Sequence, residues 1–436
     1  MWVKQKIALD NPLRLFYHYV RAVLANIMYG FPSRKMTIIG VTGTNGKTTT
    51  TNIIARGLKA SGKKVFMFST VNYFIGENEY RNNTKMTSPD PFLLQSLLKQ
   101  AKNEWCEIAV IETSSHAMVM NRVWWIEYDI AVLTNITQDH LDLHKTMDNY
   151  VRAKLQLFKT LIMKKRKSWV KKTAIINLES DYKELFLNET YDNLTTYGFD
   201  YDAIIRPTNI KNEIDFTSFD VKFPGSNGDL NIKTKMRGKH NIYNILAAMW
   251  VFLSLGMKPE EIQKSILDVE GVPGRLEDIK NYEWFKVFID YAHTPDALEK
   301  TLQTVRDIAW VQRIITVFGA TGDRDKTKRP IMGKIVSDMS DFVVLTQDDD
   351  YTESTGQIIK DVLPGIERKE WENFWIIPDR ESAIRTALLE AQKNDAVVIA
   401  GKWDEHVMVT NQWIVEYNDK KVVLKVLQEI DDNKVM

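Results

Sequence analysis

The sequence predicts an α/β protein with two parallel-sheet domains, and two observations lead to this prediction. From residue 36 to about residue 178, short apolar runs typical of buried strands alternate with segments of helical spacing. A second alternation of the same kind begins near residue 284. Because strands that alternate with helices form parallel sheets covered by helices, each region should form one such domain.

The expected strands of the first region are residues 36–39, 64–68, 108–111 and 130–133, and those of the second are residues 284–289, 313–318, 342–345 and 396–399. Between residues 190 and 236 the runs are shorter and more β-like. We therefore divide the 436 residues into an N-terminal helix over 1–35, a central domain over 36–278 and a C-terminal domain over 279–436.

The segment before the first strand predicts one amphipathic helix, which begins near Asn11 and Pro12 and ends before Gly30. Apolar residues three or four apart define one face: Leu13, Phe16, Val20, Leu24 and Ile27. We expect this face to pack on the body of the protein. The alternative is a helix on a membrane surface, which four further side chains support: Arg14, Tyr17, Tyr19 and Arg21.

Composition narrows the classes of function. Charge is balanced, with 58 basic and 57 acidic residues, so no nucleic-acid partner is expected. The single cysteine, Cys106, excludes an internal disulfide and a cysteine metal site, which suits a reducing compartment. Neither a signal peptide nor an apolar run of the roughly 20 residues needed to span a bilayer is visible. We expect a cytoplasmic protein.

The most informative segment is GVTGTNGKT, residues 40–48, which lies between an expected strand and an expected helix. A glycine-rich turn that ends in Gly-Lys-Thr at a helix start directs backbone N–H groups at the phosphates of a nucleotide. Lys47 adds a positive charge, and the Thr48 hydroxyl can ligate Mg²⁺. Val41 stands where the strict motif has glycine. The segment predicts binding of ATP or a close relative.

Two further segments follow expected strands of the same domain. Glu112 opens ETSSH directly after residues 108–111, where a carboxylate is well placed for Mg²⁺. The second segment, TNITQDHLDLH over residues 134–144, holds four titratable groups within six positions, which suggests ion or phosphate chemistry. Lys154 follows on an expected helix, where periodicity alone favours a surface lysine.

Taken together, seven motifs in order resemble the Mur ligases: GTNGKT (43–48), ETSSH (112–116), TNITQDHLD (134–142), HNIYN (240–244), VPGRLE (272–277), DYAHTPD (290–296) and GDRDK (322–326). The last three are most similar to the branch that adds the third residue of the peptidoglycan stem peptide. The resemblance runs from about residue 30 to the C-terminus. It implies a central P-loop ATPase domain, a Rossmann-like C-terminal domain and a monomer in cell-wall synthesis.

The resemblance also implies a reaction. ATP would phosphorylate a carboxylate of a muropeptide acceptor, and the amine of a free amino acid would then displace phosphate from the acyl phosphate. Closure of the two domains should assemble the site. The residues with catalytic roles would be Lys47, Lys154, His140 and Arg275.

Site residues carry over position by position. The resemblance assigns ATP to Gly43, Thr44, Asn45, Gly46, Lys47, Thr48, Thr49, Asn241 and His293. Two Mg²⁺ ions would use Thr48, Glu112, His140 and Lys154, the last carbamylated by CO₂. Acceptor contacts would be Thr87, Ser88, Ser114 and Arg122, and amino-acid contacts Arg324, Asp348, Asp349, Tyr351, Gly401 and Glu405. Alone, Thr87 and Ser88 would be interpreted as an ordinary turn.

Two departures from the family pattern bear on specificity. Only about 35 residues precede the first strand, where this branch has a uridine-binding domain. The family's Asp-Asn-Pro-Arg loop, whose arginine clamps the distal carboxylate of diaminopimelate, is here DDDY over residues 348–351. Its Gly-Lys-Gly-His-Glu loop is here GKWDE over residues 401–405. Because both loops are acidic, the second through Asp404 and Glu405, and Tyr351 carries no charge, we predict a lysine- or ornithine-like substrate. The alternative is that the carboxylates are solvated or paired with Arg324 and Lys326.

Three hypotheses follow. The first, which we favour, is a tripeptide-synthetase-like ligase that adds a diamino acid to a UDP-N-acetylmuramoyl-dipeptide-like acceptor. The second is a related ligase for another acceptor, such as a lipid-linked muropeptide or a polyglutamate- or cyanophycin-like chain. The third is a non-catalytic nucleotide-binding regulator, which has no need of the full set of metal-binding residues.

Overall fold

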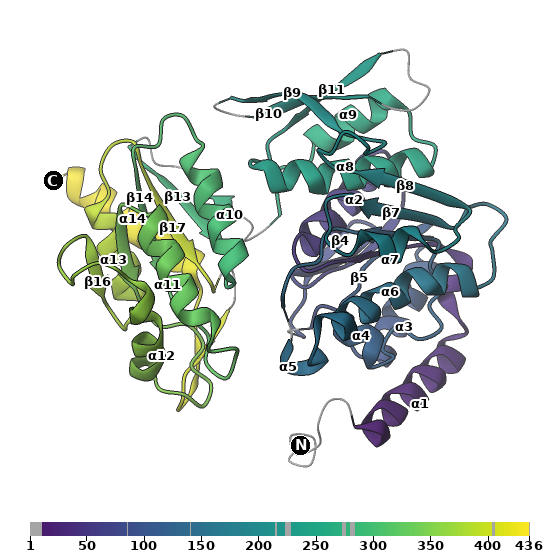
Figure 1. Ribbon diagram of the computed structural model, residues 1–436, viewed down its shortest axis with the longest axis horizontal. Helices are drawn as coiled ribbons and strands as arrows, with labels where there is room; N and C mark the ends of the chain where they lie inside the picture. The colour runs from purple at the N-terminus through teal and green to yellow at the C-terminus, as the bar shows by residue number, and fades with distance from the viewer. Residues whose placement is uncertain are drawn as a thin grey trace. The chain divides into compact units, whose positions relative to one another are not determined.

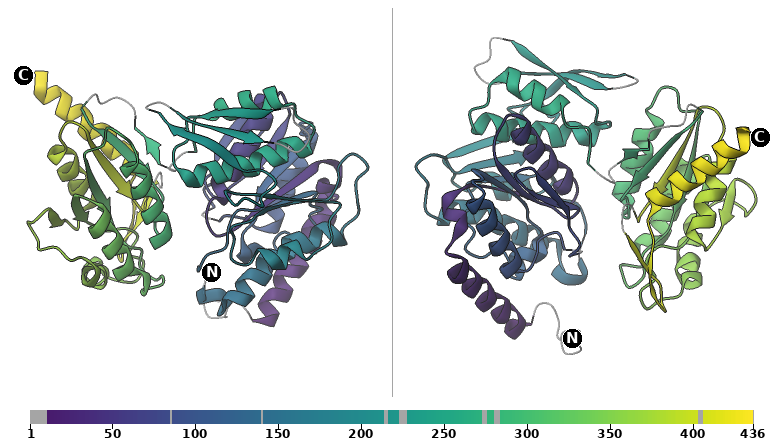
Figure 2. Two further views of the ribbon diagram at one scale, coloured as in Figure 1. Left: turned by 45° about the horizontal axis from the view of Figure 1, so that its top comes forward. Right: turned by 180° about the vertical axis from the view of Figure 1, so that it is seen from behind.

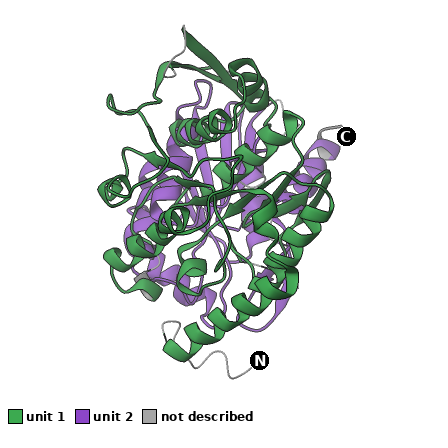
Figure 3. Cartoon of the chain, turned by 90° about the vertical axis from the view of Figure 1, so that its right-hand side faces the viewer, with its two compact units in different colours: residues 1–270 green, residues 271–436 purple. Residues whose placement is uncertain are grey.

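The computed structural model describes residues 11–84, 86–139, 141–213, 216–222, 228–272, 276–279, 284–402 and 406–435. Two compact units divide the chain, residues 1–270 and residues 271–436 (Figure 3). The division falls before β12 (Glu277–Asp278), whereas the expected boundary at residue 278 follows it. The reason is that β12 pairs antiparallel with β13 (Lys286–Asp290) of the second unit.

An eight-stranded sheet organises unit 1 (Figure 1). Its strands, in spatial order, are β4 (Asn78–Arg81), β3 (Asn72–Ile75), β2 (Val65–Phe68), β5 (Ile108–Glu112), β1 (Thr37–Thr42), β6 (Ile130–Leu133), β7 (Thr173–Asn177) and β8 (Asn193–Tyr197). From β2 to β8 every neighbouring pair is parallel, and the hairpin β3–β4 adds an antiparallel edge. The sheet confirms the predicted fold class, and β1 is buried along its whole length at the centre.

Helices cover both faces of this sheet. One face packs against α3 (Pro91–Asn103), α4 (Ser115–Val119), α6 (Met147–Met163) and α7 (Lys183–Leu187). The opposite side carries α2 (Lys47–Ala60), α8 (Lys239–Ser254) and α9 (Pro259–Leu267). The short helix α5 (Leu141–His144) precedes α6 and contacts it. The β-like stretch forms a separate antiparallel sheet of β9 (Pro207–Asn212), β10 (Thr217–Lys222) and β11 (Asp229–Thr234), beside α9.

The N-terminal helix, α1 (Pro12–Tyr29), belongs to unit 1. Asn11 caps its start by accepting a hydrogen bond from the Leu13 N–H, and Gly30 ends it in a left-handed conformation. The side chains buried against the body are Ala22, Ala25 and Asn26. The face expected to pack is instead exposed, with Leu13 at 78% and Ile27 at 58%, so that prediction was wrong. The docked side carries two alanines, whose small side chains allow a close approach of the helix.

Unit 2 is a second α/β layer structure. Its sheet has the order β12, β13, β17 (Asp395–Ala400), β14 (Arg313–Phe318), β15 (Phe342–Leu345) and β16 (Phe374–Ile376), and all pairs from β13 onwards are parallel. The helices α10 (Pro295–Arg306), α11 (Lys328–Met339) and α12 (Thr355–Val362) cover one face. The helices α13 (Arg380–Glu390) and α14 (Asp419–Val435) pack together on the other, and β18 (Val407–Val409) with β19 (Ile414–Glu416) forms a hairpin.

None of the helices formed by the described residues is both long and apolar enough to cross a bilayer.

Candidate active site

The parallel strands β5, β1 and β6 end at one edge of the unit 1 sheet, where Val41 of β1 lies in register with Glu112 and with Val132. The connection between β1 and α2 therefore lies between the ends of two neighbouring strands. In open α/β sheets this edge is where ligands bind. The sequence motifs at residues 43–48, 112–116 and 134–139 all follow these strands.

Two glycines shape the turn after β1. Gly43 has φ of +152°, and a Cβ there would lie 1.9 Å from the Thr134 hydroxyl. Gly46 has φ of +80°, and its Cβ would lie 2.5 Å from the side-chain oxygen of Asn244. Side chains rarely adopt such φ values, and here the neighbouring atoms leave no space for one. The turn must therefore carry glycine at both positions.

The loop after β6 fixes the other residues of this turn. The backbone N–H of Thr44 donates to the Asn135 carbonyl at 2.8 Å. The Asn135 side chain accepts from the Asn45 N–H at 2.9 Å and donates to the Asn45 carbonyl at 3.0 Å. Thr134 adds a hydroxyl bond of 2.6 Å to that carbonyl. These bonds order the turn before α2 begins.

α2 begins at Lys47, so the N–H groups of its first turn, including those of Thr48 and Thr49, point out of the helix end. Together with the helix dipole they form an anion-binding site. The Lys47 ammonium lies over the same turn, 2.7 Å from the Thr44 carbonyl. The residues therefore fit the phosphates of a nucleotide, as predicted.

α8 adjoins α2 and brings two asparagines to the turn. Thr50 donates to the Asn244 side-chain oxygen at 3.1 Å, and Asn244 donates to the Asn241 side-chain oxygen at 3.1 Å. Asn241 was assigned to ATP from the resemblance, and it lies at the start of α8 beside the turn. Asn244 links the two helices.

Glu112 lies at the end of β5 and is buried among hydroxyl and amide donors. The Thr48 hydroxyl lies 3.1 Å from each of its carboxylate oxygens. Thr70, which follows β2, donates its N–H at 2.7 Å and its hydroxyl at 3.0 Å. A carboxylate beside a hydroxyl offers the oxygen ligands that Mg²⁺ prefers, so this pair fits a magnesium ion.

Lys154 is buried at 1% exposure on α6, not at the surface as periodicity alone favours. Its ammonium lies 2.5 Å from the Gly43 carbonyl and 4.3 Å from the centre of the Tyr150 ring. Burial holds the pKa of Lys154 well below its usual value, the neighbouring Lys47 lowers it further, and Asp139 partly opposes both effects. A buried lysine with a lowered pKa thus touches the phosphate-binding turn.

Three predicted site residues, His140, Arg275 and Glu405, lie outside the described residues. Among the residues that the structure does describe, no three His, Cys, Asp or Glu side chains gather in a way that could hold a metal ion. Thr48, Glu112 and Lys154 therefore supply the described part of the proposed metal site.

The four residues assigned to the acceptor come together in unit 1. Ser88 donates to the Glu112 carbonyl at 3.0 Å, and its hydroxyl lies 3.4 Å from that of Ser114. Arg122 donates to the Ser88 carbonyl at 3.2 Å. The Thr87 hydroxyl lies 3.0 Å from the hydroxyl of Thr70, which donates to Glu112. The residues assigned to the acceptor are therefore connected by hydrogen bonds to Glu112.

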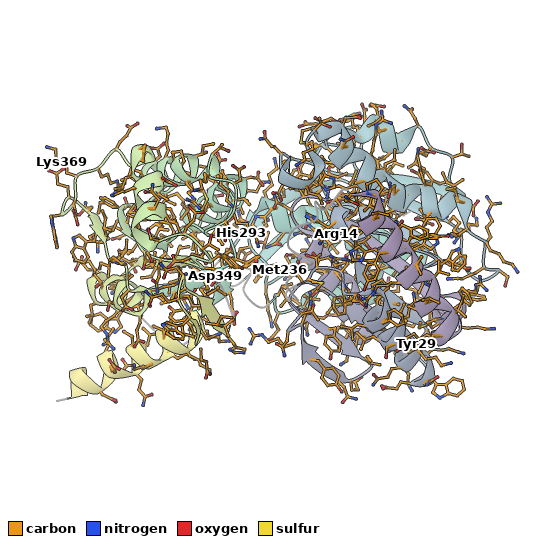
Figure 4. The ribbon with its side chains drawn as sticks, turned by 90° about the horizontal axis from the view of Figure 1, so that it is seen from below. Arg14, Tyr29, Met236, His293, Asp349 and Lys369 are labelled. Atoms are coloured by element: carbon orange, nitrogen blue, oxygen red, sulfur yellow. The ribbon has the colours of Figure 1, made fainter. Side chains whose placement is uncertain are left out.

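In unit 2, the predicted residues follow the carboxyl ends of four parallel strands: His293 after β13, Arg324 after β14, Asp348, Asp349 and Tyr351 after β15, and Gly401 after β17. Figure 4 labels His293 and Asp349. The His293 ring lies 2.8 Å from the Tyr291 carbonyl, and the Arg324 guanidinium lies 5.5 Å from the centre of the Tyr351 ring. One edge of the sheet thus holds all of those predicted residues of unit 2 that the structure describes.

The acidic loop itself is buried, with Asp348, Asp349 and Asp350 each at 4% exposure or less. Asp349 pairs with the buried Lys402 at 2.6 Å and accepts from the Val409 N–H at 2.7 Å. Asp350 accepts from the Thr355 hydroxyl, and burial raises the pKa of its carboxyl. The carboxylates are therefore neither solvated nor paired with Arg324 and Lys326; the Lys326 ammonium instead pairs with Glu353 at 2.8 Å.

The sequence did not single out four residues of these sites: Thr70, Asn135, Tyr150 and Lys402. Asn135 stands inside a quoted motif, and Thr70 follows a strand end, which is the signal that could have found it. Lys402 stands inside the GKWDE loop, whereas Tyr150 carried no signal beyond its neighbours in the sequence.

A phosphate-binding turn with an adjoining carboxylate and a buried lysine defines an enzyme of nucleotide-dependent phosphoryl transfer. Residues 41–252 match the model of the Mur ligase middle domain, and residues 274–403 match the Mur ligase, glutamate ligase domain. The chain belongs to the Mur ligase family, and it is an ATP-dependent, ADP-forming ligase.

Similar proteins agree with this assignment. The chain is 40% identical over 93% of its length to the UDP-N-acetylmuramoyl-L-alanyl-D-glutamate–2,6-diaminopimelate ligase of Syntrophomonas wolfei, of which it covers 81%. It is 36% identical over 98% of its length to the enzyme of that name from Geobacillus kaustophilus, of which it covers 86%.

Solved structures show the same fold. A structure of a ligase of that name matches 91% of the chain with a TM-score of 0.64 and 30% identity, and the match covers 79% of it. Folylpolyglutamate synthase of Mycobacterium tuberculosis matches 88% of the chain with a TM-score of 0.70, and the match covers 92% of it. At 18% identity, this second likeness concerns the fold alone.

Proposed function

We propose that the protein forms an amide bond between the carboxylate of a UDP-N-acetylmuramoyl-dipeptide acceptor and an amino group of a diamino acid, as a step of peptidoglycan synthesis. Its relatives from Syntrophomonas wolfei and Geobacillus kaustophilus are named for a reaction of this kind. The observation that carries the proposal is the grouping of Lys47, Thr48, Glu112 and Lys154 around one turn, next to the acceptor loop at Thr87 and Ser88.

A carboxylate is a poor electrophile, so amide formation needs its activation. The turn at residues 43–48 binds the triphosphate, and Lys47 offsets the repulsion between it and the incoming carboxylate. The carboxylate oxygen attacks the γ-phosphorus, ADP leaves, and an acyl phosphate forms. The amine then adds to the acyl carbon, loses a proton, and inorganic phosphate leaves. Arg275 is proposed to reach over the phosphates.

Two Mg²⁺ ions, when bound, supply positive charge that stabilises the phosphoryl transfer. Thr48 and Glu112 would hold one of them, because they present a hydroxyl beside a carboxylate. Lys154 and His140 are proposed to hold the second.

A lysine needs chemical modification to serve as a metal ligand. Its neutral amine can attack CO₂ and lose a proton, and the resulting carbamate is an anionic oxygen ligand. Burial and the nearby Lys47 lower the pKa of Lys154, which favours the neutral amine that this reaction requires. We therefore propose that Lys154 is carbamylated in the active enzyme.

The amino acid that is added follows from the acidic loop. Among the described residues, the three buried carboxyl groups of Asp348, Asp349 and Asp350 face one ion-paired lysine, Lys402. The Arg380 guanidinium near Asp348 is already paired with Asp419, so the loop keeps an acidic excess. An acidic excess favours a side-chain ammonium, and Tyr351 cannot clamp a second carboxylate. We propose a preference for lysine or ornithine, although the relatives are named for diaminopimelate. Competition between lysine and meso-diaminopimelate tests this preference, and a preference for diaminopimelate refutes it.

The reaction is tested by measuring ADP release with all three substrates and with each substrate left out in turn. The protein should release ADP only when ATP, a muropeptide acceptor and a diamino acid are all present, and the product should have the mass of the amide. A panel with UDP-linked, UDP-free and lipid-linked muropeptides, and with polyglutamate- and cyanophycin-like chains, identifies the acceptor. Strong turnover with an acceptor other than the UDP-linked dipeptide would support the second hypothesis, a related ligase for another acceptor. Nucleotide binding without turnover on any acceptor would favour a regulator.

We also propose that the enzyme acts as a monomer, which sedimentation velocity of the purified chain tests.

A further inference from the structure

The outer face of α1 is apolar along the length of the helix. We define the apolar strip as the exposed residues of this face: Leu13, Phe16, Tyr17, Leu24, Ile27 and Met28. Their exposed fractions run from 47% for Tyr17 to 78% for Leu13. Their spacing of three, four or seven residues places them on one side of the helix. Soluble proteins rarely leave such a continuous apolar surface uncovered.

Packing on the opposite side fixes the direction in which the strip points. Asn26 is buried and donates to the Trp124 carbonyl at 2.9 Å. Arg21 forms an ion pair of 2.7 Å with Asp90 at the start of α3. Figures 1 and 2 show α1 at the surface of unit 1, with its inner side against α3. The exposure of the strip therefore follows from how the helix docks.

The surface beside the strip is also apolar and aromatic. The Tyr19 ring packs edge-on against Trp124 at 5.4 Å, and the Lys164 ammonium lies 5.2 Å from the centre of that indole ring. Met163, at the end of α6, is 80% exposed. Trp169 is 58% exposed and donates to the hydroxyl of Thr37, shortly after α1.

This neighbouring segment, residues 164–172, is strongly basic. It contains six Lys or Arg residues and no acidic residue, in a chain whose total charge is balanced. Part of this charge is used in folding, because Lys167 and Lys172 pair with the buried Asp129. Lys165 and Lys171 are exposed, and neither makes an ion pair with any residue that the structure describes.

We propose that the apolar strip and residues 164–172 together form a docking surface for a membrane that contains anionic lipids. A single convex helix face suits the interfacial region of a bilayer, into which its aliphatic and aromatic side chains can insert. The basic flank gives the charge complementarity to anionic headgroups, and tryptophan prefers this interface. The contact is peripheral. Arg21 also ties α1 to Asp90, which follows the acceptor loop in the sequence.

Vesicle flotation of the full chain tests the proposal. The probes are vesicles of phosphatidylcholine alone and vesicles to which phosphatidylglycerol has been added. The combined variant Leu13→Ser, Phe16→Ser and Leu24→Ser removes apolar area, and Trp371→Ser with Leu389→Ser is its control at exposed apolar positions of unit 2. A charge variant, Lys165→Glu with Lys171→Glu, is matched by Lys360→Glu with Lys369→Glu at exposed lysines.

The proposal predicts that the wild type floats with anionic vesicles and that high salt weakens the binding. The apolar variant should bind at least about tenfold more weakly. The charge variant should lose about tenfold in affinity for anionic vesicles alone. Both controls should bind like the wild type.

Several outcomes would overturn the proposal. One is that the wild type does not bind anionic vesicles, or that the apolar variant binds them as strongly as the wild type does. Another is a wild-type dimer in sedimentation velocity that becomes monomeric in the apolar variant, which would show that a second copy covers the strip. A third is a much lower unfolding temperature for the apolar variant than for its control, which would show that the chain itself covers the strip.

Discussion

Asn135→Ala should weaken ATP binding without unfolding the protein. The Asn135 side chain makes two hydrogen bonds to the backbone of Asn45, at 2.9 and 3.0 Å, and these hold the phosphate-binding turn. Each is worth about 1 kcal/mol, so their loss costs about 2 kcal/mol. If that cost falls on the ordered turn that ATP requires, affinity falls by roughly thirtyfold. The backbone bond from Thr44 to Asn135 remains, so the loop stays attached.

Calorimetric titration with a non-hydrolysable ATP analogue measures this effect directly. The matched control is Asn231→Ala, which removes an exposed side-chain bond of 2.7 Å to Asp220 in the three-stranded sheet. The control should bind the analogue like the wild type. Equal affinity of Asn135→Ala and wild type would refute the role given to this side chain, and so would an equal loss in both variants.

Four further predictions concern three side chains. Lys154→Ala should abolish turnover, with partial recovery in high bicarbonate or with short carboxylates, and full activity would contradict the proposed carbamate. In CO₂-depleted buffer, where Lys154 is a free amine, its pKa is lower in the folded than in the unfolded protein. Between that lowered pKa and the ordinary value near 10.4 the unfolded state binds more protons, so stability rises with pH, and Lys154→Met should remove this rise in denaturant titrations. Tyr351→Arg should shift competition kinetics toward meso-diaminopimelate, and an unchanged preference would show that this position does not select the substrate. Arg329 and then Lys326 hold the pKa of the Glu353 carboxyl far below its ordinary value near 4.3. The ionised carboxylate therefore stabilises the folded state fully above that pH, and this stabilisation is lost on acidification. Glu353→Gln should cost about 3 kcal/mol at neutral pH and flatten the acid limb of the stability curve, whereas an unchanged acid limb would contradict this assignment.

Local patterns were sufficient to predict the sheets and the phosphate-binding turn. The turn is specified by glycines whose neighbours leave no space for a side chain, and by a lysine and threonine that open the next helix. The central strands are continuous apolar runs, as expected for strands buried on both faces. Because these properties are contained in consecutive residues, they could be read without knowledge of distant contacts.

The docking face of α1 could not be predicted in this way. Helical spacing identifies the face with Leu13 and Ile27, but it does not say what covers that face. The side that approaches the body carries Ala22 and Ala25, because small side chains allow close contact. The choice between the two faces depends on the partner surface near Trp124, about a hundred residues later in the chain.

The environments of the site residues also depended on distant contacts. The helical pattern around Lys154 is typical of a surface lysine. Its burial depends on the contact with Gly43, which lies more than a hundred residues earlier in the chain. Thr70 reaches Glu112 because β2 and β5 are neighbours in the sheet. The pairing of Asp349 with Lys402 likewise joins two loops that follow different strands.

The most direct test of the proposed reaction follows one oxygen atom. An acceptor whose free carboxylate is labelled with oxygen-18 is incubated with the enzyme, ATP and the preferred diamino acid, and the released inorganic phosphate is analysed by mass spectrometry. Activation as an acyl phosphate predicts that each phosphate carries one labelled oxygen, because the bond that breaks is the one between the acyl carbon and that oxygen. Unlabelled phosphate released in step with amide formation would contradict this mechanism.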